Sequence, residues 1–411
     1  MEGFRSSHCV RSTVTNQFKL NNSLPFNKYA YLTTHNAYAI EGEPSRTGVP
    51  RVTFTNQEDS VTQQLNNGVR ALMLDTYDFE GDVWLCHSRG GKCYDITAFE
   101  PAVETFREIE AFLAANPSEI ITLILEDYVR APNGLTRAFN DSGLVKYWFP
   151  AARMPRRGGD WPLVSDMIAA NQRLVVFTSI PSKEESEGIA FQWNYMVENQ
   201  YGDGGMKDGR CRNRAESAPL DDKTKSLVLV NYFSSIPLKQ ITCVHNSADL
   251  MGMLHTCYAA AGSRWANFVA VDYYKRSKGG GPFQATDTLN GRLLCGCDDV
   301  HACEPSVPTM CQTQPPPLSP PPPSLSPSPS LSLSLSISLS LSLSLSPVDQ
   351  RRFFFPQWPL DTSSSLYIYG ASRLGECPYR AGRFQADSAD SDPGRARVGN
   401  LFLANICTKL L

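Results

Sequence analysis

Two histidines and three carboxylates occupy equivalent places in the sequence, because each comes directly after a short run of apolar residues. They are His35, Asp75, His87, Glu126 and Asp272. Two imidazoles can share acid–base work, since one takes a proton from an attacking hydroxyl while the other donates a proton to the leaving oxygen. A single polar residue after a strand usually marks only where the chain meets water. Five that obey the same rule favour one common site.

The other side chains near these positions narrow the chemistry. Asn36, Asp75 and Glu126 offer hard oxygen ligands, a set suited to Ca²⁺ or Mg²⁺ at a phosphate. A carboxylate hydrogen-bonded to the first histidine would fix its tautomer and favour its protonated form. The G-x-S-x-G motif of serine hydrolases is missing from the sequence, which argues against acyl transfer. This inventory predicts cleavage of a phosphodiester.

The elements that must position these residues are short apolar runs separated by helical or loop-like segments. The runs are Tyr31–Thr34, Val69–Leu74, Val83–Cys86, Ile120–Leu125, Leu174–Phe177, Leu227–Val230 and Phe268–Val271. Several are continuously apolar, which is typical of strands buried on both faces of a parallel sheet. Such a series predicts an α/β fold of the (β/α) barrel type, in which the carboxyl ends of the strands carry the site. A doubly wound sheet is the alternative, but no G-x-G-x-x-G follows the first run.

One connecting segment has a clear helical period. Residues Phe99–Asn116 place five apolar side chains on one stripe: Val103, Phe106, Ile109, Phe112 and Leu113. Asn116 precedes Pro117, and a residue before proline avoids helical backbone angles. We therefore expect a helix over Phe99–Asn116 between two strands.

Composition excludes two classes of protein. The chain has 411 residues, 42% of them hydrophobic and 19% charged, with a formal net charge of −3. A strongly basic surface is expected of a nucleic-acid partner, and this charge does not provide one. We also predict no transmembrane span, because no apolar run approaches the length that a bilayer requires.

Twelve cysteines are many for a cytosolic chain of this size, and they favour disulfides and an oxidising compartment. Cys295, Cys297, His301 and Cys303 lack the usual C-x₂₋₄-C pairing of zinc sites. Cys86 and Cys93 flank His87 closely enough for a disulfide that would staple its loop. Because the first residues contain no apolar signal-peptide core, we interpret residues 1–20 as a truncated N-terminal remnant.

The composition changes abruptly after Cys311. Residues 305–348 form a low-complexity segment, first rich in proline and then almost pure Ser-Leu alternation. A CT dinucleotide repeat translates as alternating Leu and Ser, so we interpret this segment as repetitive or intronic DNA in the gene model, and otherwise as a disordered linker. Residues 349–411 show no sustained period and are assigned no fold. The final eleven residues lack the long apolar tail of a glycosylphosphatidylinositol (GPI) signal.

The motifs around the candidate site resemble a known family. They are Thr34-His35-Asn36-Ala37-Tyr38, Gly68–Asp75, Trp84-Leu85-Cys86-His87, Asn116-Pro117-Ser118-Glu119, Leu123–Asp127 and Asn199-Gln200-Tyr201-Gly202. Together they resemble the X domain of phosphatidylinositol-specific phospholipase C (PI-PLC), and more closely the plant PLC-like phosphodiesterases. The resemblance covers roughly residues 21–304, and it implies a distorted TIM barrel.

The resemblance also implies roles for the acid–base residues. His35 resembles the general base that deprotonates the inositol 2-hydroxyl, whose oxygen attacks phosphorus to give a cyclic phosphodiester. His87 resembles the general acid for the diacylglycerol oxygen. Asp272 resembles the acid that orients the first histidine in the bacterial enzymes. We expect catalysis to depend on these three residues.

The same resemblance implies a Ca²⁺ site formed by Asn36, Asp75 and Glu126. The calcium-dependent enzymes carry a further acid two residues before the aspartate, where this chain has Met73. A thioether is a poor ligand for a hard cation, so the expected site is one carboxylate short. The calcium-independent bacterial enzymes have an arginine at the position of Asp75, which is also absent here. Thr178-Ser179 replaces the family's basic contact to the inositol phosphate.

Three interpretations compete. The leading one is a secreted or cell-surface phosphodiesterase that acts on a phospholipid or GPI headgroup at a membrane surface. The alternative is a catalytically weak or inactive barrel that serves as a lipid- or glycan-binding module. A third is a defective gene product. Arg70 could be proposed as a substitute for the missing basic contact, but alternation along the strand turns it away from Asp75, so we expect it to be structural.

Overall fold

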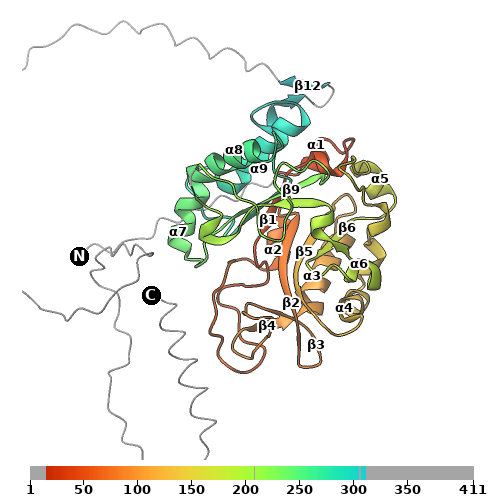
Figure 1. Ribbon diagram of the computed structural model, residues 1–411, viewed down its shortest axis with the longest axis vertical. Coiled ribbons are helices and arrows are strands. Elements are labelled where there is room, and N and C mark those ends of the chain that lie inside the picture. The colour runs from red at the N-terminus through yellow and green to blue at the C-terminus, as the bar shows by residue number, and fades with distance from the viewer. Residues whose placement is uncertain (1–14, 208, 305–306, 312–411) are drawn as a thin grey trace, which may run out of the picture. The chain divides into compact units, whose positions relative to one another are not determined.

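A curled sheet of parallel strands forms the centre of this computed structural model, which describes residues 15–207, 209–304 and 307–311 (Figure 1). The parallel strands are β1 (Tyr31–Thr34), β2 (Ala71–Phe79), β5 (Ile121–Tyr128), β6 (Leu174–Thr178), β7 (Ala190–Phe191), β8 (Met196–Glu198), β9 (Leu227–Tyr232) and β10 (Phe268–Val271). They pair in the order β7-β6-β5-β2-β1-β10-β9-β8. Because the first strand pairs with the last, the sheet closes there, and within the described ranges its ladder is interrupted between β7 and β8. The predicted α/β fold of the distorted barrel type is confirmed.

The run Val83–Cys86 does not form a barrel strand, which corrects one sequence expectation. β3 (Asp82–Cys86) instead pairs antiparallel with the end of β2, and β4 (Ala98–Pro101) pairs antiparallel with β3. β2 therefore extends beyond the predicted Leu74 to Phe79, because its last residues hydrogen-bond with this added hairpin. Two short strands that the sequence reading missed, β7 and β8, complete the parallel set.

Helices surround the curled sheet (Figure 1). They are α1 (Gln17–Leu20), α2 (Val61–Asn66), α3 (Ala102–Ala115), α4 (Gly134–Ser142), α5 (Val164–Ala169), α6 (Lys183–Ser186), α7 (Lys239–Val244), α8 (Leu250–Ala260) and α9 (Gly281–Leu294). A π-helical turn at His245–Asp249 joins α7 to α8, and a small antiparallel pair, β11 (Cys303–Glu304) and β12 (Val307–Cys311), follows α9. Short 3₁₀ turns occur at Phe26–Lys28, Leu144–Tyr147, Ala151–Arg153, Gln192–Asn194, Gly202–Gly204 and Val300–Ala302.

The helix expected at Phe99–Asn116 is confirmed as α3, with a later start. Phe99 lies in β4, so the helix begins after Pro101, a residue that lacks the backbone N–H that a longer helix would use. It ends before Asn116 as predicted. Four of the five stripe residues are buried, and Val103 is half-buried.

Alternate residues of each strand enter two separate cores. One set packs against the surrounding helices and includes Leu32, Leu72, Leu123, Val176, Val228 and Val269. The other set fills the barrel interior and includes Tyr31, Ile124, Phe177, Leu229 and Phe268. Aromatic rings crowd the amino-terminal half of the interior, where Tyr31 stacks on Phe26 and Phe268 with ring centroids 4.9 Å and 5.4 Å away. This leaves the carboxyl ends of the strands for polar side chains.

Arg70 has the structural role expected from strand alternation. Its Nε donates to Glu119 over 2.8 Å, and the two side chains are only 5% and 3% exposed. Its Nη1 also donates to the backbone oxygens of Leu65 and Val69. The guanidinium is thus held by buried acceptors at the end of the barrel opposite the candidate site.

Disulfides join Cys86 to Cys93, Cys211 to Cys257 and Cys295 to Cys303. The first confirms the staple expected beside His87. The third takes up two thiols of the Cys295, Cys297 and Cys303 cluster, and Cys297 is disulfide-bonded as well. A zinc ligand must be a free thiolate, and the sulfurs of Cys295, Cys297 and Cys303 are instead joined in disulfides.

Part of the predicted chain organisation lies outside the described residues. This applies to residues 1–14 of the expected remnant, to residues 305–306 and 312–348 of the low-complexity segment, and to the 349–411 tail. Residues 17–20 form α1, and Phe18 packs against Tyr29 and Tyr31 in the interior core. No helix of the described part is long and apolar enough to cross a bilayer.

Candidate functional site

His35 and Asp272 are brought together by the pairing of the first and last strands. Thr34 at the end of β1 lies opposite Val271 at the end of β10, so the next residue of each strand faces the other. His35 Nδ1 lies 2.9 Å from Asp272 Oδ1. A carboxylate oxygen only accepts here, so Nδ1 carries the proton and Nε2 keeps a lone pair. The ring of Phe233, next after β9, stacks on the imidazole at 3.6 Å.

A loop that the sequence reading missed holds this pair in place. Asn56 Nδ2 donates to Asp272 Oδ1 over 2.9 Å, and Gln57 Nε2 donates to the backbone oxygen of His35 over 2.8 Å. The backbone oxygen of Asn56 accepts from Tyr273, which has a left-handed φ of 42°. Both amide side chains are fully buried. Their role depends on a loop folding over two distant strands, and no local pattern announces it.

His87 follows β3 and is fixed by the same loop. Its Nδ1 donates to the backbone oxygen of Phe54 over 2.9 Å, while Thr53 Oγ1 donates to the backbone oxygen of His87 over 2.8 Å. The proton that His87 can transfer is therefore the second one, which Nε2 carries only in the protonated imidazole. Burial lowers the pKa of His87, and the neighbouring His35 lowers it further. The disulfide from Cys86 to Cys93 encloses the segment that carries His87.

Asp75 and Glu126 face each other across neighbouring strands. They are register partners in the β2–β5 ladder, so their side chains leave the same face of the sheet. Both lie within longer strands rather than after them, which corrects the expected positions but keeps the two groups together. Burial raises the pKa of Asp75 well above its usual value, and the charge of Glu126 adds to the effect.

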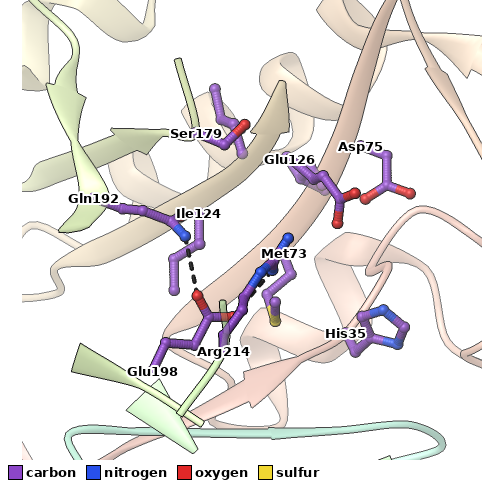
Figure 2. A pocket seen from close by; sticks show the side chains of 11 residues that line it. His35, Met73, Asp75, Ile124, Glu126, Ser179, Gln192, Glu198 and Arg214 are labelled. Carbon is purple, nitrogen blue, oxygen red and sulfur yellow. Dashed lines mark hydrogen bonds and ion pairs between the residues drawn. The ribbon is translucent and has the colours of Figure 1, made fainter. Parts of the chain in front are cut away.

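A small, partly open cavity lies at this end of the barrel. Its polar and sulfur-bearing lining residues are His35, Met73, Asp75, Glu126, Ser179, Gln192, Glu198 and Arg214 (Figure 2). Three of the predicted site residues therefore line the same cavity: His35, Asp75 and Glu126. Asn36, His87 and Asp272 do not line the cavity. Met73 reaches the cavity, so the position that differs from the resembled enzymes does face the site.

Glu198 and Arg214 form a second charged pair that the sequence reading missed. Glu198 ends β8, and its carboxylate accepts from Gln192 Nε2 at 3.1 Å, Trp193 Nε1 at 2.9 Å, Asn231 Nδ2 at 2.8 Å and Arg214 Nη1 at 3.2 Å. The side chain is 1% exposed. These donors occupy both oxygens, so Glu198 holds its neighbours and has no strong lone pair left for a ligand.

Comparison with known proteins identifies the family of this chain. The family model PI-PLC X 1 matches residues 33–290, which contain all six predicted site residues. The chain belongs to the PI-PLC X domain family. The resemblance first noted in the short motifs is therefore confirmed over most of the described barrel.

Individual relatives of this X domain come from plants, fungi and bacteria. A PI-PLC X domain-containing protein of Arabidopsis thaliana is 53% identical over 297 residues, covering 72% of this chain and 70% of the relative. A protein named as an uncharacterized secreted protein of Arthroderma benhamiae is 24% identical over 254 residues, covering 57% of this chain and 56% of the relative. The phosphatidylinositol-specific phospholipase C of Listeria monocytogenes superposes with a TM-score of 0.43 and 14% identity, covering 64% of this chain and 94% of the bacterial one.

The X domain has oxygen donors suited to a hard divalent cation. Oδ1 of Asn36 is buried and has no hydrogen-bond donor in the described part of the chain. The turn at Asn36 is held next to β2, because the backbone N–H of Ala37 donates to the backbone oxygen of Met73 over 3.0 Å. Asp75 is buried and faces the half-buried Glu126, and two facing carboxylates are costly unless a cation or proton offsets their charge. These donors fit Ca²⁺, with the thioether of Met73 as the one soft neighbour.

The side chains of Thr178 and Ser179 both hydrogen-bond with Asp127. Thr178 Oγ1 donates to Asp127 Oδ2 over 2.7 Å, and Ser179 Oγ accepts from the backbone of Asp127 over 2.9 Å. Lys183 forms a buried ion pair with the same carboxylate at 3.0 Å. The nearest lysine of this region is therefore tied to Asp127 and does not line the cavity.

Proposed function

We propose that this X domain cleaves a phosphodiester in a phosphatidylinositol or GPI headgroup by acid–base catalysis. The observation that carries the proposal is the 2.9 Å contact between His35 Nδ1 and the buried Asp272, at the edge of a cavity lined by acidic groups. A buried carboxylate that orients an imidazole prepares its second nitrogen as a base. Family membership supports the reaction class.

The proposed reaction needs two proton transfers. His35 Nε2 takes the proton of the inositol 2-hydroxyl as that oxygen forms a bond to phosphorus. The bond from phosphorus to the diacylglycerol oxygen breaks, and His87 Nε2 gives its proton to that oxygen. The products are a cyclic inositol phosphodiester and a free lipid alcohol. Asp272 stays ionised and stabilises the imidazolium that forms on His35.

We further propose that Asn36, Asp75 and Glu126 would hold Ca²⁺. When bound, a divalent cation supplies positive charge that offsets the charge of a phosphoryl group. The side chains themselves provide the hard oxygen atoms and the fixed geometry. Their support is the unpartnered Oδ1 of Asn36 and the facing carboxylates on β2 and β5.

An exposed aliphatic patch supports a membrane surface as partner. Ile236, Leu238, Ile241 and Val244 are 39%, 45%, 46% and 58% exposed, and they lie on α7 and the loop before it (Figure 1). The same loop begins with Phe233, whose ring covers His35. A patch beside the catalytic pair would bring that pair to lipid headgroups. Together with the disulfides, this supports a secreted or cell-surface location.

The experiment is product analysis by phosphorus NMR on the full chain with phosphatidylinositol in vesicles, with Ca²⁺ or with EDTA. We expect a cyclic inositol phosphate from the wild type and none from His35→Ala. His255→Ala is the matched control, because His255 is an exposed residue of α8 outside the cavity, and it should keep wild-type activity. Equal product from wild type and His35→Ala would contradict the proposal.

A non-catalytic lipid- or glycan-binding module is the second candidate. The observation in its favour is Met73, which occupies the cavity where the resembled calcium-dependent enzymes have an acid. This module would bind headgroup-bearing vesicles equally well as wild type and His35→Ala, with no product from either. Turnover that requires His35 would rule it out.

A further inference from the structure

Arg214 is a basic side chain in the cavity to which the acid–base scheme gives no role. It lies in the segment between β8 and β9, and its side chain is 11% exposed. In the part of the chain that the structure describes, it is the one lysine or arginine that lines the cavity. Figure 2 shows its guanidinium pointing from the Glu198 side toward Met73 and the Asp75–Glu126 pair.

The guanidinium is held firmly at several points. Nη1 donates to Glu198 over 3.2 Å and Nε donates to Glu216 over 3.0 Å. Its central carbon lies 5.3 Å from the ring centroid of Trp193 and 4.8 Å from that of Tyr201. Such contacts fix the plane of an arginine and reduce the entropy lost when a ligand binds.

The backbone around Arg214 is tethered as well. Its N–H donates to the backbone oxygen of Glu198 over 2.9 Å, and Asn213 bridges to Asn199. Three residues earlier, Cys211 forms a disulfide with Cys257 on α8. The segment therefore carries the side chain to the cavity as part of a rigid scaffold.

One edge of this guanidinium remains available. No acceptor among the described residues takes a hydrogen bond from Nη2, although Nε and Nη1 are both committed. The carboxylates of Asp75 and Glu126 interact electrostatically with Arg214 but make no direct hydrogen bond to it. A ligand oxygen between these groups would accept from Nη2 without displacing any protein contact.

The charge of the cavity calls for such a group. Asp75, Glu126 and Glu198 would repel the anionic oxygens of a phosphodiester, and Glu198 is offset by Arg214 itself. Guanidinium groups bind phosphate oxygens with short, charge-assisted hydrogen bonds. A fixed arginine facing the pair of strand carboxylates can therefore draw the phosphate into a cavity that is otherwise acidic.

We propose that Arg214 is a specificity-determining residue, whose Nη2 edge binds a phosphate oxygen of the substrate headgroup. This inference rests on the proposed function and deepens it. Arg214 thus supplies from the β8–β9 segment the basic contact that Thr178-Ser179 does not provide. Through this contact, the cavity would bind a phosphate-bearing headgroup more tightly than a neutral polyol.

Binding can be measured without turnover by isothermal titration calorimetry of the full chain in phosphate-free buffer. The probes are inositol 1-phosphate, inorganic phosphate and myo-inositol, each with Ca²⁺ or with EDTA. We expect both phosphate probes to bind the wild type, and Arg214→Gln to weaken that binding about tenfold or more, since a charge-assisted hydrogen bond is lost. Binding of inositol 1-phosphate but not inorganic phosphate would assign the ligand to a headgroup rather than to a free ion.

Two further variants control the experiment. Arg214→Lys keeps the charge and should bind inositol 1-phosphate with intermediate affinity, because an ammonium group lacks the planar set of N–H donors of a guanidinium. Arg156→Gln removes an exposed arginine that pairs with Glu184 and rests near the Tyr195 ring outside the cavity, and its affinity should equal that of the wild type. Circular dichroism confirms folding, and Arg214→Lys carries the test if Arg214→Gln does not fold.

The outcomes separate this inference from the proposed function. Wild-type affinity for inositol 1-phosphate in Arg214→Gln or, if that variant does not fold, in Arg214→Lys would overturn the role of Arg214. Phosphate binding that depends on Arg214, without turnover of any phosphodiester, would support the inference while the proposed reaction fails. Turnover with an unchanged KM in Arg214→Gln would leave the reaction standing and remove Arg214 from it. A KM raised about tenfold would support both.

Discussion

His35 Nδ1 donates a hydrogen bond to Asp272 Oδ1 over 2.9 Å, although 237 positions separate the two residues in the chain. Asp272→Asn keeps the side-chain shape but presents an amide that can donate to Nδ1 and reverse the imidazole tautomer. We expect kcat to fall about a hundredfold or more with KM nearly unchanged, since a general base contributes on the order of 10²–10⁴. Steady-state kinetics on vesicles checks this, and a variant with wild-type kcat would contradict the assigned geometry.

The buried state of His87 predicts a specific pH dependence. Burial lowers the pKa of His87 below its ordinary value, and a general acid works only while protonated. The active form is therefore lost as pH rises through a pKa that lies below the usual histidine value of about 6.5. We expect kcat/KM to decline on the alkaline side from below that pH. A profile that stays flat up to pH 8 would exclude His87 as the acid of the free enzyme.

Asp75 and Glu126 should affect thermal stability in opposite directions in the absence and in the presence of Ca²⁺. Asp75→Asn removes a buried charge whose pKa is raised by burial and by Glu126, so the metal-free variant should melt above the metal-free wild type. Added Ca²⁺ should stabilise only the wild type, by about 2.7 kcal/mol at a hundred times Kd. Thermal melts in EDTA and in Ca²⁺ measure both effects. Equal stabilisation of the two proteins by Ca²⁺ would place the ion elsewhere.

The ion pair at the far end of the barrel should matter for stability alone. Glu119→Gln leaves the buried guanidinium of Arg70 without its counter-charge, and we expect the free energy of unfolding to fall by about 3–5 kcal/mol. Denaturant titration measures this loss. Activity of the folded fraction, assayed well below the melting temperature, should equal that of the wild type, and a selective loss of kcat would show that Arg70 reaches the site.

The aliphatic patch on α7 predicts a separation of membrane binding from chemistry. Ile241→Ser with Val244→Ser should weaken vesicle binding about tenfold or more, because two side chains lose apolar burial in the lipid interface. Turnover of a short-chain, monomeric substrate should not change. Val145→Ser, an exposed aliphatic on a different segment, is the control. Unchanged vesicle sedimentation of the double variant would remove this patch as the membrane contact.

Local sequence patterns predicted much of the barrel, and their failures have clear causes. Continuous apolar runs identified six of the parallel strands, because strands buried on both faces admit few polar residues. The same signal misplaced Val83–Cys86, since an antiparallel strand of a hairpin can be equally apolar. The strands β7 and β8 were missed because two or three residues cannot show a period.

The residues of the candidate site also fall into those that local patterns revealed and those that they did not. His35, His87, Asp75, Glu126 and Asp272 were found because each stands beside an apolar run in a recognisable motif. Asn56, Glu198 and Arg214 were missed because they act through contacts between distant segments. Cys86 and Cys93 were found as a pair because only seven positions separate them, whereas nothing local joined Cys211 to Cys257.

By itself, the sequence determined the fold class, the acid–base residue types of the candidate site and the direction in which Arg70 points, since period, polarity and alternation are local properties of the chain. Only the tertiary structure decided that one loop fixes both histidines and that Arg214 faces the carboxylate pair. These relationships depend on which strands become neighbours when the sheet curls. That choice reflects the free energy of the whole packed barrel, to which each local segment contributes only a part.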